Sequence, residues 1–375
     1  MNILIAGDLC PGFRIAKLAE ESQFQQILGN VKSVIESADY SLVNLECPVV
    51  TTSTAKPISK NGPNLRTTFK GIELIKYAGF KGVTLANNHF MDFGDHGATE
   101  TLKVCDSVGL DRVGAGMNVI EAAAILYKKI ENKIVAFINC CEHEFSIATD
   151  TMPGCNALNP IQQFYAIREA RTKADYVIVI VHGGHEFYQL PSPRMKELYR
   201  YFIDCGADTV INHHQHCYSG YEVYCNKPIF YGLGNFLFDN TERHTTWNQG
   251  YMVQLSFLPA EITFELFPYN QCNEQPSVSL FAGEERKMFD NKIDKLNKII
   301  ADDAALSYEH QKWMDATERW FELQLTPYSN RYLQILCTHG FLPKFLPLQK
   351  RLRIINYIDC ESHRDRILQV LKNGI

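Results

Sequence analysis

The chain has 375 residues, of which 46% are hydrophobic and 21% charged, so it is long enough for one large globular domain or two of ordinary size. Its formal net charge of −5 and isoelectric point of about 6.2 argue against a general nucleic-acid-binding protein, which normally presents a basic face. No apolar run approaches the roughly 20 residues of a membrane span, and the first residues, MNILIAGDLCPG, lack the basic and long apolar regions of a signal peptide, so we expect no transmembrane anchor.

Short apolar runs alternate with helical patterns over the first 270 residues. Strands that alternate with helices predict a layered α/β fold. The expected strands are residues 2–7, 40–46, 80–89, 133–140, 175–184 and 207–214. The expected helices are residues 14–37, 70–78, 96–107, 160–172 and 193–205.

The pattern changes after residue 217. Residues 221–239 and 250–270 are typical of hairpins that extend or cover the sheet. From about residue 280 the chain becomes charged and helical in period. We therefore predict two domains, a catalytic domain over residues 1–275 and a helical C-terminal extension over residues 276–375.

An aromatic stripe marks the predicted extension. Trp313, Trp320 and Phe321 recur there at roughly helical spacing. We expect this stripe to pack against the core or against a second subunit, which would make the chain a homo-oligomer through its C-terminal helices.

The twelve cysteines are scattered along the chain, and no two of them form a C-x-x-C pair. Cys105 and Cys205 lie in amphipathic patterns that are typical of core positions. We interpret the cysteines as free thiols of a reducing compartment and expect the protein to be cytoplasmic.

Polar residues able to bind metal follow five of the predicted strands. Ligand sites of open α/β sheets lie outside the carboxyl ends of the strands, so these residues are expected to converge. Taken singly, each has another explanation: Asp8 could cap a helix, Glu46 could lie on the surface, and the histidines could mark loops. The set comprises Asp8, Asn44 and Glu46, Asn87 to His89, His182 with His185 and Glu186, and His213, His214 and His216.

The chemistry of this set suits two metal ions better than one. A carboxylate such as Glu46 can bridge two cations, and mixed oxygen and nitrogen ligands favour Mn, Fe or Zn over Ca, with Mg as an alternative. Two such ions can activate a water molecule and stabilise a developing anion. His89, beside Asn88, is then a candidate general acid.

Seven segments, in this order, resemble the CapA family of poly-γ-glutamate capsule biosynthesis proteins over about residues 1–240. They are GDLCPG, NLECP, GFKGVTLANNHFMDFGDHGATETL, VGAG, VHGGHEF, GADTVINHHQHCYSGYE and PIFYGLGNFLFD. That family is similar in turn to the calcineurin-like metallophosphatases, so the resemblance implies a four-layer α/β/β/α sandwich.

The resemblance also implies roles for individual residues. Asp8, Glu46 and His216 would bind one metal, and Asn88, His182 and His214 would complete the other with Glu46. His89 would be the acid–base histidine. Asn87, Asn235 and Glu186 would line the substrate site, and we expect His213 to lie there as well.

Two positions depart from the metallophosphatase pattern. Cys10 stands where those enzymes usually carry a ligand histidine, and it is either a soft ligand or, as we favour, a core residue. Glu46 stands where they carry a bridging aspartate, and its longer side chain would change the metal geometry.

We therefore predict a metal-dependent hydrolase that acts on a phosphoester or amide-like bond of a small-molecule, peptide or polymer substrate. One alternative is a peptide epimerase on the same site, with His185, Glu186 and Cys10 as candidate bases. Another is a capsule-assembly factor without catalytic activity.

Overall fold

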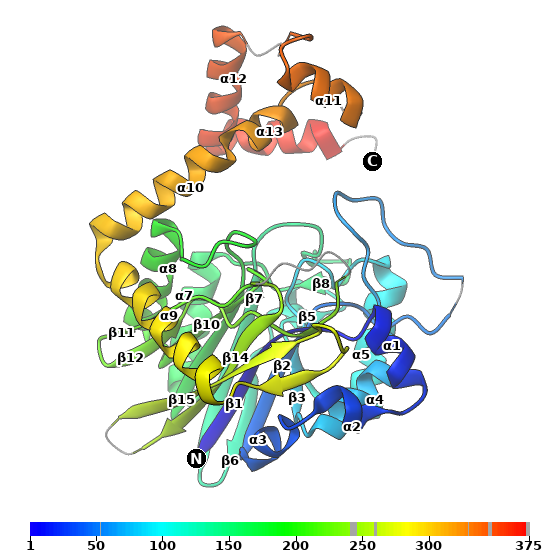
Figure 1. Ribbon diagram of the computed structural model, residues 1–375, viewed down its shortest axis with the longest axis vertical. Helices are drawn as coiled ribbons and strands as arrows, with labels where there is room; N and C mark the ends of the chain where they lie inside the picture. The colour runs from blue at the N-terminus through cyan, green and yellow to red at the C-terminus, as the bar shows by residue number, and fades with distance from the viewer. Residues whose placement is uncertain (53, 241–245, 259–260, 329, 344–346, 373–375) are drawn as a thin grey trace. The chain divides into compact units, whose positions relative to one another are not determined.

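The structure is a computed structural model that describes residues 1–52, 54–240, 246–258, 261–328, 330–343 and 347–372 (Figure 1). The chain forms two compact units, Met1–Ser307 and Tyr308–Ile375. The first unit contains both large sheets and every residue of the predicted site.

The first sheet has eight strands in the order β16-β15-β14-β1-β2-β3-β4, with β13 also paired to β1. Strands β1 to β4 and β13 run parallel, and β14 to β16 are antiparallel. Their bounds are β1 Asn2–Cys10, β2 Tyr40–Leu45, β3 Gly82–Thr84, β4 Asp111–Val113, β13 Asn235–Phe238, β14 Gln249–Phe257, β15 Ile262–Gln271 and β16 Val278–Leu280.

The second sheet has six strands in the order β11-β12-β10-β9-β7-β6. Its four central strands are parallel, and the two edge strands are antiparallel. The bounds are β6 Leu126–Ile130, β7 Lys133–Cys141, β9 Tyr176–His182, β10 Thr209–His213, β11 Tyr221–Tyr224 and β12 Lys227–Phe230. A separate two-stranded pair joins β5 Ala115–Gly116 to β8 Gly154–Cys155.

Helices cover the outer faces of the two sheets, which pack against each other. Tyr40 of β2 lies 5.3 Å from Phe137 of β7, and Tyr176 of β9 lies 4.5 Å from Phe257 of β14, as ring-centroid distances. This confirms the four-layer α/β/β/α arrangement (Figure 1). The helices are α1 Phe13–Glu20, α2 Phe24–Leu28, α3 Lys32–Ser37, α4 Phe69–Ala78 and α5 Gly94–Ser107 on the first sheet, α7 Pro160–Lys173 and α8 Pro193–Cys205 on the second, and the short α6 Val119–Ala122.

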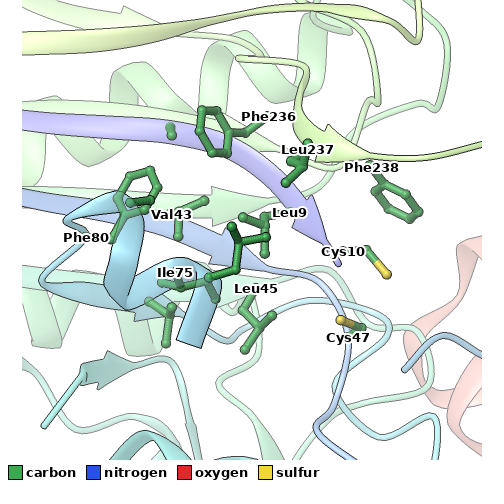
Figure 2. Packing of buried hydrophobic residues seen from close by; sticks show 14 of the residues in the cluster. Leu9, Cys10, Val43, Leu45, Cys47, Ile75, Phe80, Phe236, Leu237 and Phe238 are labelled. Atoms are coloured by element: carbon green, nitrogen blue, oxygen red, sulfur yellow. The ribbon is translucent and has the colours of Figure 1, made fainter. Parts of the chain in front are cut away.

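The apolar runs of the strands form the core beneath the first helical layer. Figure 2 shows side chains of this cluster, including Leu9, Val43, Ile75 and Phe236. Burial of these side chains provides most of the driving force for packing α1 to α5 on the sheet. Cys10 belongs to the same buried cluster, as expected for a core residue.

Strand β1 changes its neighbour just before the predicted site. Residues Asn2 to Ile5 pair with β14, whereas Asp8 pairs with Asn235 of β13, and the register shifts on either side of Asp8. At Gly7 a Cβ atom would lie 1.8 Å from the Gly234 carbonyl oxygen, so only glycine allows this approach. Such irregularities re-aim a side chain at a functional site.

Three expected elements differ in detail. The helix expected over residues 14–37 is three short helices, because Ser22 adopts a φ of +56° between α1 and α2, and Gly29 a φ of +50° between α2 and α3. The strand expected over 80–89 is limited to β3, since the Ala86 amide donates to the Asn139 side chain and the chain then turns. The hairpin expected over 221–239 comprises β11 and β12 only, and β13 joins the other sheet.

The chain after residue 280 is helical, as expected. Helix α9 Gly283–Ala301 belongs to the first compact unit and buries Phe289, Ile293 and Ile300. The functional boundary at residue 275 stays a prediction. The remaining helices are α10 Asp303–Gln324, α11 Arg331–Thr338, α12 Leu348–Asp359 and α13 Glu361–Lys372.

In the second unit Trp320 and Phe321 are 57% and 50% exposed, so packing of the predicted stripe stays a prediction. Among the helices that the structure describes, none has the length and apolar character needed to cross a membrane. All twelve cysteines are free thiols.

Candidate metal centre

The carboxyl ends of the two sheets bring the six predicted ligands together. Asp8 lies in β1, Glu46 follows β2, and Asn88 follows β3 in the first sheet. His182 ends β9, and His214 and His216 follow β10 in the second sheet. Each of the six residues is buried, and the strand register places His182 directly beside His213.

One group of ligand atoms surrounds Nε2 of His182. This atom lies 3.0 Å from Asn88 Oδ1 and 3.1 Å from His214 Nδ1. It also lies 3.6 Å from Glu46 Oε1. Separations of this size fit donor atoms that each lie about 2.0–2.2 Å from a shared ion. We call Glu46, Asn88, His182 and His214 the second half-site.

A second group of atoms shares the Glu46 carboxylate. His216 Nε2 lies 3.7 Å from Glu46 Oε1, and its Nδ1 lies 3.8 Å from Asp8 Oδ2. Nδ1 of His216 also lies 2.9 Å from Asn235 Oδ1, an acceptor that fixes the tautomer with Nε2 unprotonated. We call Asp8, Glu46 and His216 the first half-site. One oxygen or nitrogen from each of its three members lies within 4.8 Å of the others.

The electrostatics of Glu46 fit a resident cation. Both carboxylate oxygens are buried and have no hydrogen-bond partner among the described residues. Burial, and then the charge of Asp8, raise the pKa of Glu46 well above its usual value. An ionised carboxylate in this position is costly unless a cation compensates it. A metal ion shared by the two half-sites would supply that compensation.

Two of the predicted ligand histidines are in the state that metal binding requires. Burial lowers the pKa of His182 and of His216, so both rings are held neutral. His214 and His216 adopt positive φ angles of 89° and 53°. Such backbone strain in non-glycine residues is concentrated at functional sites, where the surroundings hold it in place.

His89 lies beside the second half-site and is nearly buried. Its Nδ1 lies 2.7 Å from Asp92 Oδ2, so the ring is held by a carboxylate. Asp92 was not predicted, although its i,i+3 spacing from His89 in NNHFMD was a usable signal. Lys60, whose ammonium pairs with the other oxygen of Asp92, was not predicted either.

Two acidic residues after β7 also escaped prediction. Glu144 Oε2 accepts a hydrogen bond from Asn88 Nδ2 at 3.2 Å, and Glu144 Oε1 lies 3.6 Å from His214 Nε2. Glu142 accepts from the Gly184 amide at 3.0 Å. The strand-end rule points to both, because CCEHE directly follows the expected strand 133–140.

Asn44 was noted at a strand end but given no role. Its Nδ2 donates to Asp8 Oδ1 at 2.7 Å. The backbone amide of His214 donates to Asp8 Oδ2 at 3.0 Å. The Asp8 carboxylate is therefore oriented from both sides before any ion binds.

The predicted substrate-binding residues Asn87 and Asn235 have other tasks in the structure. Nδ2 of Asn87 donates to the carbonyls of Leu45 and Leu85, and its Oδ1 accepts from the His89 amide. Oδ1 of Asn235 accepts from His216 Nδ1, and its Nδ2 donates to the carbonyl of Trp247. Both side chains are fully buried and brace the site, and their contact with substrate stays a prediction.

His213 is also buried, and burial lowers its pKa. The predicted catalytic residues His185 and Glu186 lie at the rim, where His185 is half-buried and Glu186 exposed. Burial and then nearby charges, that of Glu186 among them, raise the pKa of Glu46. Glu186 and His185 are therefore better placed than His213 to meet a substrate.

The comparison with known families agrees with this arrangement. The family described as "Bacterial capsule synthesis protein PGA_cap" matches residues 2–240, which include all six predicted ligands. The chain belongs to this family. The resemblance to CapA proteins is thereby confirmed, and residues 241–375 lie outside the matched region.

Two relatives carry capsule-related names. The capsule biosynthesis protein CapA of Bacillus anthracis is 32% identical over 247 residues, which cover 64% of this chain and 60% of the relative. The PGA biosynthesis protein CapA of Bacillus subtilis is 33% identical over 243 residues, which cover 64% and 63%. The chain thus spans about three fifths of the length of these relatives. Among solved structures, a phosphatase from Mycoplasma pneumoniae is similar at 14% identity with a TM-score of 0.43, covering 73% of this chain and 95% of that one.

Proposed function

We propose that this member of the PGA_cap family is a dinuclear metal-dependent hydrolase that cleaves a phosphoester or amide-like bond, in capsule or surface-polymer metabolism. The observation that supports it best is the sharing of Glu46. Two groups of potential ligands overlap at this one buried carboxylate, which has no hydrogen-bond partner among the described residues. A single structural ion would not require two such groups.

Different residues would bind the metal ions, transfer the proton and contact the substrate. Two divalent cations, Mn, Fe or Zn, with Mg as an alternative, would supply an activated water molecule and neutralise developing negative charge. The two half-sites would hold them. His89, oriented by Asp92, would hold the proton that the leaving group takes. Glu186 and His185 at the rim would contact the substrate.

The decisive experiment joins metal content to turnover. Plasma mass spectrometry on the purified protein, and after reconstitution with each candidate ion, is expected to give about two metal equivalents. The loaded protein is then assayed on p-nitrophenyl phosphoesters and on peptides with α- or γ-glutamyl amide bonds. His89→Ala is the matched variant, and it should keep the metal while losing about 100-fold or more in kcat on substrates whose leaving group needs a proton, such as peptides and phenyl phosphoesters. Absence of bound metal under every condition would refute the proposal.

A second function is favoured by the acid–base groups at the rim. An epimerase needs a proton acceptor and a proton donor on opposite sides of a carbon atom, and Glu186 or His185 would supply one group beyond His89. Cys10 does not suit this role, because it is buried in the core. Incorporation of solvent deuterium into a peptide without cleavage would indicate epimerisation. Neither cleavage nor exchange, with metal bound, would favour an assembly factor.

A further inference from the structure

A buried lysine lies next to His89. Lys60 belongs to the irregular segment between β2 and α4, and its side chain is 1% exposed, whereas lysine is almost never fully buried unless paired. Its Nζ forms an ion pair with Asp92 Oδ1 and lies 3.1 Å from His89 Nδ1. A lysine buried beside the candidate acid–base histidine is a feature that the dinuclear centre itself does not require.

The contacts of Asp92 show on which group Lys60 acts. Asp92 Oδ2 accepts from His89 Nδ1 at 2.7 Å and from the Leu65 amide at 2.6 Å. Because an ionised carboxylate can only accept, the proton of the ring lies on Nδ1. Lys60 therefore cannot also donate to that nitrogen. Its ammonium pairs instead with the remaining oxygen of Asp92, so it holds the carboxylate that holds His89.

The segment around Lys60 is tied to the backbone of Asp92. The Ile58 amide donates to the Asp92 carbonyl at 2.9 Å, and Asn64 Nδ2 donates to the Ile58 carbonyl at 3.1 Å. On the other side, the Lys60 ammonium lies 5.3 Å from the ring centroid of Phe145, within reach of a cation–π interaction. The position of the ammonium is therefore fixed by packing from two directions.

We infer that Lys60 is a positioning residue for the reaction, which locks Asp92 so that His89 keeps Nδ1 bonded and Nε2 available to the substrate. The inference rests on the proposed function, in which His89 supplies the proton of the leaving group. Without Lys60, Asp92 Oδ1 would be a buried anionic oxygen with its counter-ion removed, and the carboxylate would turn toward other donors. His89 would then lose its fixed orientation, while the metal ligands would stay in place.

Kinetics can separate this role from a merely structural one. Lys60→Met is compared with wild type on two aryl phosphoesters, one with the good leaving group p-nitrophenolate and one with the poor leaving group phenolate. Only the poor leaving group needs a proton in the transition state. We expect kcat for the phenyl ester to fall about 10-fold or more and kcat for the p-nitrophenyl ester to change less than about 2-fold, with KM and metal content unchanged. Equal effects on both esters would overturn the inference.

A readout without turnover keeps the test independent of the proposed function. In the zinc-loaded and metal-free proteins, the proton shared by His89 and Asp92 is expected as a far-downfield NMR signal, assigned by its loss in His89→Gln. The signal should disappear in Lys60→Met and persist in Lys60→Arg, which retains the cation, and in Lys56→Met, which removes an exposed lysine of the same segment. Persistence of the signal in folded Lys60→Met would overturn the inference. If wild type shows the signal but hydrolyses nothing, the proposed function fails and the role of Lys60 in orienting His89 is still decided.

Discussion

The two half-sites share Glu46 but differ in the number of side chains that they offer. The second half-site has four, because Asn88, His182 and His214 join Glu46 around the Nε2 atom of His182. The first has three, and Cys10 lies outside it. We therefore expect the second half-site to bind its ion more tightly, and the first to have more coordination positions for water or substrate.

The surroundings of the two half-sites differ as well. His216 of the first packs against the rings of Trp247 and Phe238, at centroid distances of 4.6 and 5.3 Å, and is oriented by the neutral Asn235. His214 of the second faces the carboxylate of Glu144, which is about one third exposed. A carboxylate partner raises the basicity of a ligand histidine more than an amide does. Both differences predict that the two ions are bound with unequal affinity.

The largest effect should come from Glu46→Gln, because this change removes the shared ligand charge with little change in shape. Metal content should fall from about two equivalents to nearly zero, and turnover should be lost. The metal-free variant should be more stable than metal-free wild type by about 1–3 kcal/mol, since a buried ionisable group without a partner becomes neutral. Metal analysis and urea unfolding measure these changes. Retention of one full equivalent would show that the half-sites do not share Glu46.

Removing one ligand at a time should distinguish the two half-sites, because each variant should lose the ion of one half-site only. His216→Ala should lose about one equivalent from the first half-site and keep the other ion, and His214→Ala should lose the ion of the second. The unequal ligand sets predict that His216→Ala leaves the tighter ion behind. Competition with a chelator, followed by metal analysis, tests this order. An identical residual affinity in both variants would mean that the half-sites are equivalent.

A smaller effect is expected from the residues that orient the ligands. Asn235→Ala should weaken binding at the first half-site about 10–100-fold, and Glu144→Gln should weaken the second but not the first. Calorimetric titration of metal into each variant gives both constants. If Asn235→Ala weakened the two sites equally, its effect would be on the fold and not on His216.

The pH dependence of metal binding should reflect Glu46 more than the histidines. Its pKa is raised in the metal-free fold, and the ion binds only the ionised carboxylate, so binding must release this proton. Affinity should rise with pH by up to tenfold per unit until the raised pKa is passed, and level off above it. The pKa values of His182 and His216 are lowered, so neither ring competes for a proton at neutral pH. Calorimetry in buffers of different ionisation enthalpy should count about one proton released per protein; none released would contradict the raised pKa.

Much of this centre could be predicted from the sequence because strand ends carry local signals. Asp8, Glu46, His182 and His214 each follow an apolar run, and parallel strands deliver such residues to one edge. The order of strands and helices was equally readable from alternating patterns. The family resemblance added the assignment of ligands to individual ions, which spacing along the chain does not contain.

What escaped prediction depends on contacts between distant or irregular segments. Lys60 lies in a segment without periodicity, and its partner Asp92 is 32 residues further on. The hydrogen bond from the Asn87 side-chain amide to the Leu45 carbonyl could not be predicted either, because the direction of a side chain in a tight turn is set by which carbonyls lie within reach. The break between α2 and α3 follows from the positive φ of Gly29, which cannot be distinguished in sequence from a tolerated helical glycine.

The smallest effect should come from Cys10→Ser, and it tests the inequality of the half-sites directly. Cys10 occupies the position at which metallophosphatases usually have a ligand histidine, yet its side chain packs in the core near Cys47 (Figure 2). Serine is nearly isosteric but places a hydroxyl among apolar groups, so stability should fall by about 1–3 kcal/mol. Metal content and affinity should stay at the wild-type level, as measured by mass spectrometry and calorimetry. Loss of an equivalent from the first half-site would mean that the Cys10 thiolate is a fourth ligand, and the two half-sites would then have equal numbers of side chains.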